Sequence, residues 1–110
     1  MKPLLVMTNL PDQASAEALA AVLVDGRLAA CVNILAPCRS VYEWQGATER
    51  ADEVPLLIKT SEERYPALEA ALRSSHPYKL PAIVALPVVQ ALPAFADWVI
   101  TEVNCPVVIE

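Results

Sequence analysis

The sequence is poor in glycine and histidine. Its 110 residues include only Gly26 and Gly46 as glycines, and only His76 as a histidine. A phosphate-cradling loop needs several glycines close together, so the chain carries no such motif. One histidine excludes a two-histidine metal motif and a histidine-based zinc site built from a single chain. No Ser-His-Asp signature is evident either, and we therefore expect no catalytic residues and no enzymatic activity. The alternative that stays open is a catalytic site assembled across subunits with Cys31 or His76.

Long hydrophobic runs and an excess of basic charge are also missing. No apolar run approaches the roughly 18 residues that a membrane span needs, although 55% of the residues are hydrophobic. The net charge of −5 disfavours nucleic acid and anionic membrane surfaces as partners. The apolar stretch after Lys2 is too short for a signal peptide, which favours a cytoplasmic protein. We expect the surplus apolar surface to be buried in a subunit interface.

Cysteine is scarce as well. Cys31, Cys38 and Cys105 are odd in number and lack the CxxC spacing, so we expect free thiols. Cys31 falls within a predicted strand, where a buried thiol commonly behaves as a small hydrophobic residue. A metal or redox role is the alternative for Cys31, and it requires exposure and a lowered thiol pKa.

The patterning that is present predicts one domain, residues 1–110, with the element order βαββαβ and an additional C-terminal helix. This order is that of the ferredoxin-like split βαβ arrangement, an α+β fold. Strands are expected at 3–9, 28–35, 40–44, 54–59 and 83–89, and helices at 13–25, 60–74 and 93–103, with a short terminal strand at 105–109.

Four local features sharpen this prediction. Gly26 is expected to end the first helix in a left-handed conformation. The segment 60–63, Thr-Ser-Glu-Glu, matches a capping box for the second helix, with Pro66 starting its regular part. Pro55 lacks a backbone donor and predicts an edge strand or a bulge. The last helix is expected to bury Phe95, Trp98 and Val99.

Four side chains besides Cys31, and a group of carboxylates, are candidates for a site. His76 lies on a proline-bounded loop, where it could bind a borderline metal or cap the preceding helix. Tyr42 and Trp44 share one strand face and could stack on a ligand or pack in an interface. Lys59 could donate to an interfacial ion pair or extend into solvent. Several carboxylates could bind hard cations, or could form a solvated surface.

Several segments, in this order and at these spacings, resemble the CutA family, the divalent-cation tolerance proteins. The resemblance runs nearly end to end, and its most recognisable element is His76-Pro77-Tyr78-x-x-Pro81. The other segments are Leu28 to Ile34, Ser40-x-Tyr42-x-Trp44-x-Gly46, Glu53 with Ile58-Lys59-Thr60, Tyr65 to Glu69, and Trp98.

The resemblance implies a ferredoxin-like fold and a tight homotrimer in which long hairpins interlock. It also implies an architecture similar to that of the PII signalling trimers, whose ligands bind in clefts between subunits. A role in tolerance of copper and other divalent cations follows, with no cofactor required for folding. We expect His76 and Cys31 to contact a metal and four residues to line a ligand cleft, namely Tyr42, Trp44, Lys59 and Tyr78.

Four positions depart from the family pattern, one of them Lys79, where an acidic or polar residue is common. Ala82 stands where the family usually has glutamate, which removes a carboxylate ligand. Thr8 replaces a cysteine that some relatives place beside the His-Pro-Tyr histidine, and Ser75 replaces a second histidine. Because only His76 survives of that set, a structural or adaptor trimer that works through a protein partner is the alternative function.

Overall fold

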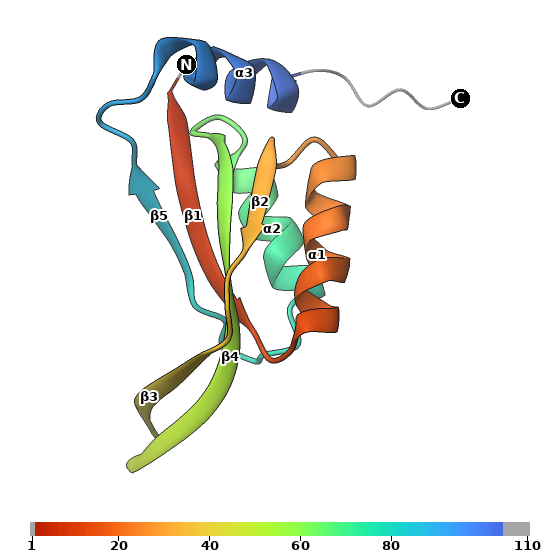
Figure 1. Cartoon of the computed structure of the whole chain (residues 1–110). Coiled ribbons are helices and arrows are strands. Elements are labelled where there is room, and N and C mark those ends of the chain that lie inside the picture. The colour runs from red at the N-terminus through yellow and green to blue at the C-terminus, as the bar shows by residue number, and fades with distance from the viewer. Residues whose placement is uncertain (1, 105–110) are drawn as a thin grey trace.

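The computed structural model describes residues 2–104, which form one antiparallel sheet and three helices (Figure 1). The expected strand at 105–109 and Cys105 lie outside the described residues. In this part of the chain no helix is long and apolar enough to cross a membrane. The elements are β1 (Pro3–Leu10), α1 (Gln13–Asp25), β2 (Cys31–Ile34), β3 (Cys38–Trp44), β4 (Ala47–Ser61), α2 (Tyr65–Ser75), β5 (Ile83–Pro87) and α3 (Pro93–Asn104).

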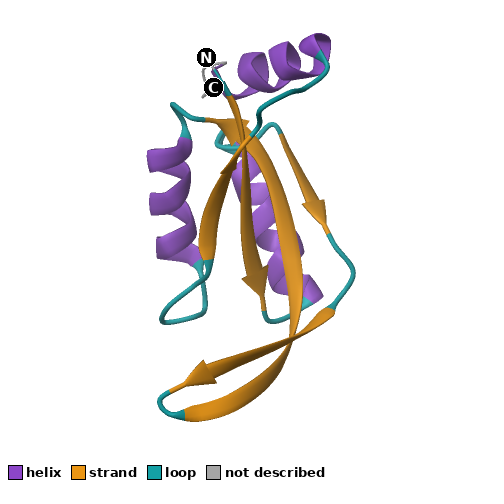
Figure 2. Ribbon diagram, turned by 90° about the vertical axis from the view of Figure 1, so that its left-hand side faces the viewer, coloured by secondary structure: helices purple, strands orange, loops and turns teal. Residues whose placement is uncertain are grey.

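The sheet has the strand order β2-β4-β1-β5, and β3 pairs with the remaining half of β4. Helices α1 and α2 cover one face of the sheet, and α3 lies across the end near the N-terminus (Figure 1). The hairpin of β3 and β4 projects beyond the helices (Figure 2). It turns at Gln45 and Gly46, which have φ values of 51° and 83°, as a tight hairpin turn requires.

The core lies between the sheet and helices α1 and α2. Alternate residues of β1 and β4 point toward the helices because side chains of a strand alternate between its faces. These strand residues meet the apolar stripes of α1 and α2, and each fully buried aliphatic side chain contributes about 1.5–3 kcal/mol. The central members of the core are Val6, Leu10, Leu19, Leu23, Leu56, Ile58, Leu68 and Leu72.

Strand β4 is longer and more central than the sequence predicts. It begins at Ala47, because the polar segment before Val54 pairs with β3 rather than forming a loop. Pro55 does not mark an edge, since β4 lies between β2 and β1. The expected bulge is present beside it, because residues 35–37 oppose only residues 54–55 between the pairs Ile34↔Leu56 and Cys38↔Glu53. The Pro55 carbonyl accepts a hydrogen bond from the Leu35 N–H at 2.9 Å. The missing donor of Pro55 faces this same side, where β2 has ended and β3 has not begun.

Two predicted element starts also differ from the structure. Strand β2 begins only at Cys31, after a turn that includes 26–28. The capping box is wrong, because Thr60 and Ser61 are the last residues of β4 and pair with β1. The Thr60 hydroxyl donates to the Leu28 carbonyl at 2.7 Å, and helix α2 begins at Tyr65 with proline in its first turn, as predicted.

Both helix α1 and helix α3 differ from prediction in one detail. Gly26 has a φ of −83°, and the left-handed residue is Arg27, with a φ of 57°. The Arg27 guanidinium bonds the Glu102 carboxylate at 2.8 Å, which ties the end of α1 to α3. In α3 the buried residues are Val99 and Val103, whereas Phe95 and Trp98 remain 42% and 43% exposed. The prediction that Phe95 and Trp98 are buried is therefore wrong for a single chain.

Candidate functional site

A cavity lies between the β3–β4 hairpin and the loop that follows α2. It has a volume of about 620 Å³, and we call it the hairpin cleft. One wall is formed by hairpin and β1 residues, namely Asn9, Ser40, Tyr42, Trp44, Ala51 and Glu53. The other wall is formed by the loop residues Pro77, Tyr78, Lys79, Leu80 and Ala82.

The hairpin register explains why these side chains converge. Ser40, Tyr42 and Trp44 are alternate residues of β3 and therefore share one face. Ser40 pairs with Ala51 across the hairpin, so Ala51 and Glu53 of β4 lie on that same face. The acidic neighbour Asp52 points to the other face, where it bonds Arg39 at 3.4 Å.

His76 lies behind the loop wall and is only 9% exposed. It forms the C-cap position of α2, but its ring turns toward β1. Its Nδ1 accepts a hydrogen bond from the Tyr78 backbone N–H at 3.2 Å, and its Nε2 lies 3.1 Å from the Thr8 hydroxyl oxygen. Since Nδ1 acts as an acceptor, the proton of the neutral ring resides on Nε2 and is donated to Thr8.

The electrostatics around His76 favour this neutral form. Burial lowers the pKa of His76 from its ordinary value of 6.5, while a hydrogen bond with the Asn9 backbone and the charge of Glu53 act in the opposite direction. Both ring nitrogens are thus occupied. A metal ion at His76 would have to displace either the Thr8 hydroxyl or the Tyr78 N–H.

Tyr78 and Glu53 form the polar centre of the hairpin cleft. Glu53 is 8% exposed, and the Tyr78 hydroxyl donates a hydrogen bond to its carboxylate. Burial, this hydrogen bond and the Glu53 charge raise the pKa of Tyr78 to about 12. The ring of Tyr78 also lies against His76, with 4.9 Å between centroids. The buried His76 therefore holds in place the tyrosine that faces the cleft.

Cys31 and Lys59 lie outside the hairpin cleft. They are paired across β2 and β4, and the Lys59 ammonium contacts the Cys31 sulfur at 3.9 Å and the Asn33 amide oxygen. The structure thus divides the predicted site residues into two groups. Tyr42, Trp44 and Tyr78 line the cleft with His76 behind them, whereas Cys31 and Lys59 form a separate pair.

Glu53 and Asn9 line the cleft although the sequence analysis did not predict it. Glu53 could have been placed there because it alternates with Ala51 on a strand opposite Ser40. Asn9 carried no signal, since only the fold brings the end of β1 to the loop. Among residues 2–104, no three His, Cys, Asp or Glu side chains come close enough to hold a metal ion.

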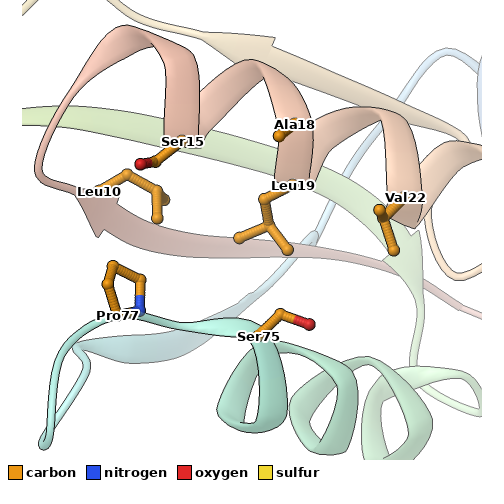
Figure 3. Close-up of a pocket in the computed structure, with 7 residues that line it drawn as sticks. All are labelled: Leu10, Ser15, Ala18, Leu19, Val22, Ser75 and Pro77. Carbon is orange, nitrogen blue, oxygen red and sulfur yellow. The ribbon is translucent and has the colours of Figure 1, made fainter.

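A second, smaller cavity of about 270 Å³ lies between α1 and the end of α2 (Figure 3). Its lining is mainly apolar, and the hydroxyls of Ser15 and Ser75 are its only polar side-chain groups. The close-up shows Leu10, Leu19 and Pro77 around the same space. Without a charged group or an acid–base pair, this cavity offers no evident chemistry.

Residues 4–102 match the family model described as CutA1 divalent ion tolerance protein. The divalent-cation tolerance protein CutA of Thermus thermophilus is 40% identical over 93 residues, which cover 84% of this chain and 90% of that protein. Protein CutA of Mus musculus is 43% identical over 89 residues, which cover 81% of this chain; the match spans about half, 50%, of the mouse protein.

Solved structures agree with the sequence matches. CutA of Xylella fastidiosa superimposes with a TM-score of 0.91 at 40% identity, covering 94% of this chain and 100% of the other. The Archaeoglobus fulgidus protein, described as a periplasmic divalent cation tolerance protein CutA, gives a TM-score of 0.90 at 32% identity and covers 93% and 99% of the two chains. The α+β architecture of one antiparallel sheet with three helices is thus shared, and the chain belongs to the CutA1 family of divalent ion tolerance proteins.

Proposed function

We propose that this chain acts in divalent-cation tolerance as a closed homotrimer of ferredoxin-like, PII-like subunits. In this proposal a divalent cation, copper among them, or another small ligand binds weakly in clefts between subunits. The observation that carries it is the family match over residues 4–102. The names of the relatives describe tolerance proteins rather than enzymes, which supports a binding role without catalysis.

Unpaired strand edges and exposed apolar residues support the trimer. Strands β2 and β5 are both edges of the four-stranded order β2-β4-β1-β5. Exposed strand edges and large apolar patches are features that proteins cover with a partner. On β5 and α3 the apolar side chains that remain at least 42% exposed are Val84, Leu86, Phe95 and Trp98.

The metal part of the proposal requires more than one subunit. His76 and Cys31 each supply one donor suited to copper, but no cluster of three such residues forms within residues 2–104. A complete site therefore needs ligands from neighbouring copies. Cys31 and Cys38 are both free, which suits a reducing compartment, and we place the protein in the cytoplasm without nucleic acid or membrane partners.

Growth under metal stress tests the proposed function. A strain that lacks its own CutA protein is supplied with this chain and grown with increasing Cu(II), Zn(II) and Co(II). We expect the chain to raise the inhibitory concentration of at least one metal, and light scattering of the purified protein to give the mass of three subunits. A monomer, or growth identical to that with empty vector for every metal, would contradict the proposal.

Metal binding itself is measured by thermal unfolding of the metal-stripped protein. A ligand in a hundredfold excess over its Kd stabilises the folded state by about 2.7 kcal/mol. The expected shift disappears in His76→Ala and in Cys31→Ser, and persists in Cys38→Ser, because the exposed Cys38 is not one of the proposed ligands. If both metal affinity and tolerance are unchanged in His76→Ala, the metal site as proposed is wrong.

A second candidate is an adaptor trimer that binds a partner protein and no metal. The contacts of His76 favour this candidate. Both of its ring nitrogens are already hydrogen-bonded, so neither is free to bind a metal. This candidate predicts a trimer whose unfolding temperature does not change with any metal tested. A metal-specific shift that depends on His76 would exclude it.

A further inference from the structure

Three aromatic side chains line the hairpin cleft. Tyr42 and Trp44 stand two residues apart on one face of β3 and are 45% and 41% exposed. Tyr78 lies on the opposite wall, with its ring fixed against His76. The faces of such rings carry negative electrostatic potential, and they attract ammonium groups within about 6 Å of the ring centroid.

Carboxylates add negative charge at the same place. Glu53 is the only carboxylate among the cleft-lining residues and is almost fully buried. Asp12, the N-cap of α1, also raises the pKa of Tyr78. A hydrogen bond from the Ser15 N–H lowers the pKa of Asp12 and keeps it ionised. Lys79 is the one cation that lines the cleft, and it is exposed, so its long side chain can extend into water.

This lining discriminates between classes of ligand. A hard metal ion takes about six to eight oxygen ligands, and the cleft offers one carboxylate. A soft metal ion prefers thiolate or imidazole, and neither cysteine nor histidine lines the cleft. An anionic ligand would be repelled by the buried Glu53 carboxylate. Aromatic side chains around a buried carboxylate instead favour an organic cation, because the rings and the carboxylate both attract positive charge.

We propose that the hairpin cleft binds a small organic cation, with the ammonium group between the rings of Tyr42, Trp44 and Tyr78 and paired with the Glu53 carboxylate. Its volume of about 620 Å³ lies within the range of small-molecule pockets. The proposal goes beyond the proposed function, because the hairpin cleft is lined by residues of one chain, whereas the metal is proposed to bind between subunits. His76 serves as a positioning residue, since it orients Tyr78 through the backbone N–H.

Tryptophan fluorescence of the intact protein tests this assignment. The chain has two tryptophans, so a Trp98→Phe background leaves Trp44 as the only reporter. Tetramethylammonium is titrated as the probe, and tert-butanol serves as a neutral probe of similar size. We expect saturable quenching by tetramethylammonium, with affinity about tenfold higher than for tert-butanol.

Two carboxylate variants make the test specific. Glu53→Gln keeps the shape of the side chain and one acceptor oxygen while removing its charge, and we expect it to weaken binding about tenfold. Asp52→Asn removes the same charge one residue away, on the opposite face of β4, and is expected to change affinity less than about twofold. Trp44→Leu, followed by calorimetry, should lose most of the affinity.

Three outcomes would overturn the proposal: equal affinity for tert-butanol, unchanged affinity in Glu53→Gln, or no binding up to about 100 mM tetramethylammonium, well beyond the millimolar affinity of a weak site. The proposed function is tested separately, by the mass of the oligomer and by growth of the strain in the presence of metal. A trimeric protein that confers tolerance but ignores tetramethylammonium refutes this inference alone. A protein that binds the cation but confers no tolerance refutes the tolerance proposal alone.

Discussion

Replacing Thr8 by valine tests the buried contact that holds the His-Pro-Tyr loop. Thr8 is 1% exposed, and its hydroxyl lies 3.1 Å from His76 Nε2. Valine has nearly the same shape, so Thr8→Val removes the hydrogen-bond acceptor without opening a cavity. A buried donor that loses its partner costs about 1–3 kcal/mol. Because the Asn9 backbone also bonds the ring, we expect a loss of about 1–2 kcal/mol in the free energy of unfolding.

Urea unfolding at one fixed protein concentration measures this loss, because the stability of an oligomer depends on concentration. Thr101→Val on the exposed side of α3 is the matched control, expected to change stability by less than about 0.5 kcal/mol. A double-mutant cycle with His76→Leu should give a coupling energy of about 0.5–3 kcal/mol. A Thr8→Val protein as stable as the parent, together with zero coupling, would refute the role assigned to this hydrogen bond.

Three further outcomes are expected. The pKa of His76 is lowered in the folded state, so the folded state is stabilised while the ring is neutral, above the ordinary pKa of 6.5. This stabilisation is lost as the pH falls through the folded-state pKa. Chemical denaturation between about pH 7 and pH 5 should therefore show a decline in the free energy of unfolding, and His76→Gln should reduce that decline. Leu56→Ala should lower the free energy of unfolding by about 2–5 kcal/mol, because Leu56 is fully buried, whereas Leu80→Ala, at a residue 71% exposed, should have little effect. Peptide-resolved mass spectrometry should find Cys38 alkylated faster than Cys31, because only Cys38 is exposed; equal rates would contradict the described burial.

Periodic patterns made most of the elements predictable. Helix α1 begins and ends where its apolar spacing predicts, at Gln13 and Asp25. The errors occur where a contact distant in sequence outweighs a local preference. Thr60 and Ser61 match a helix cap, but pairing with β1 keeps them in a strand. Pro55 disfavours a central strand locally, yet the break between β2 and β3 removes the cost of its missing donor.

The candidate site was less predictable than the fold. The alternation of Tyr42 and Trp44 indicated a shared face, which the structure places in the hairpin cleft. Their approach to Tyr78 depends on a loop more than thirty residues away along the chain, and no local pattern specifies such a distance. The separation of Lys59 from the cleft likewise follows from the register of β4 with β2.

The continuous strand β4 constrains how this chain can change during evolution. Its residues Leu56 and Ile58 face the core, while Ala51 and Glu53 face the hairpin cleft. Because strand side chains alternate, inserting one residue between these two halves would turn Glu53 away from the cleft or expose the core residues. Length variation should therefore be confined to the turn at Gln45 and Gly46, so that homologous hairpins differ in reach while preserving the spacing between core and cleft.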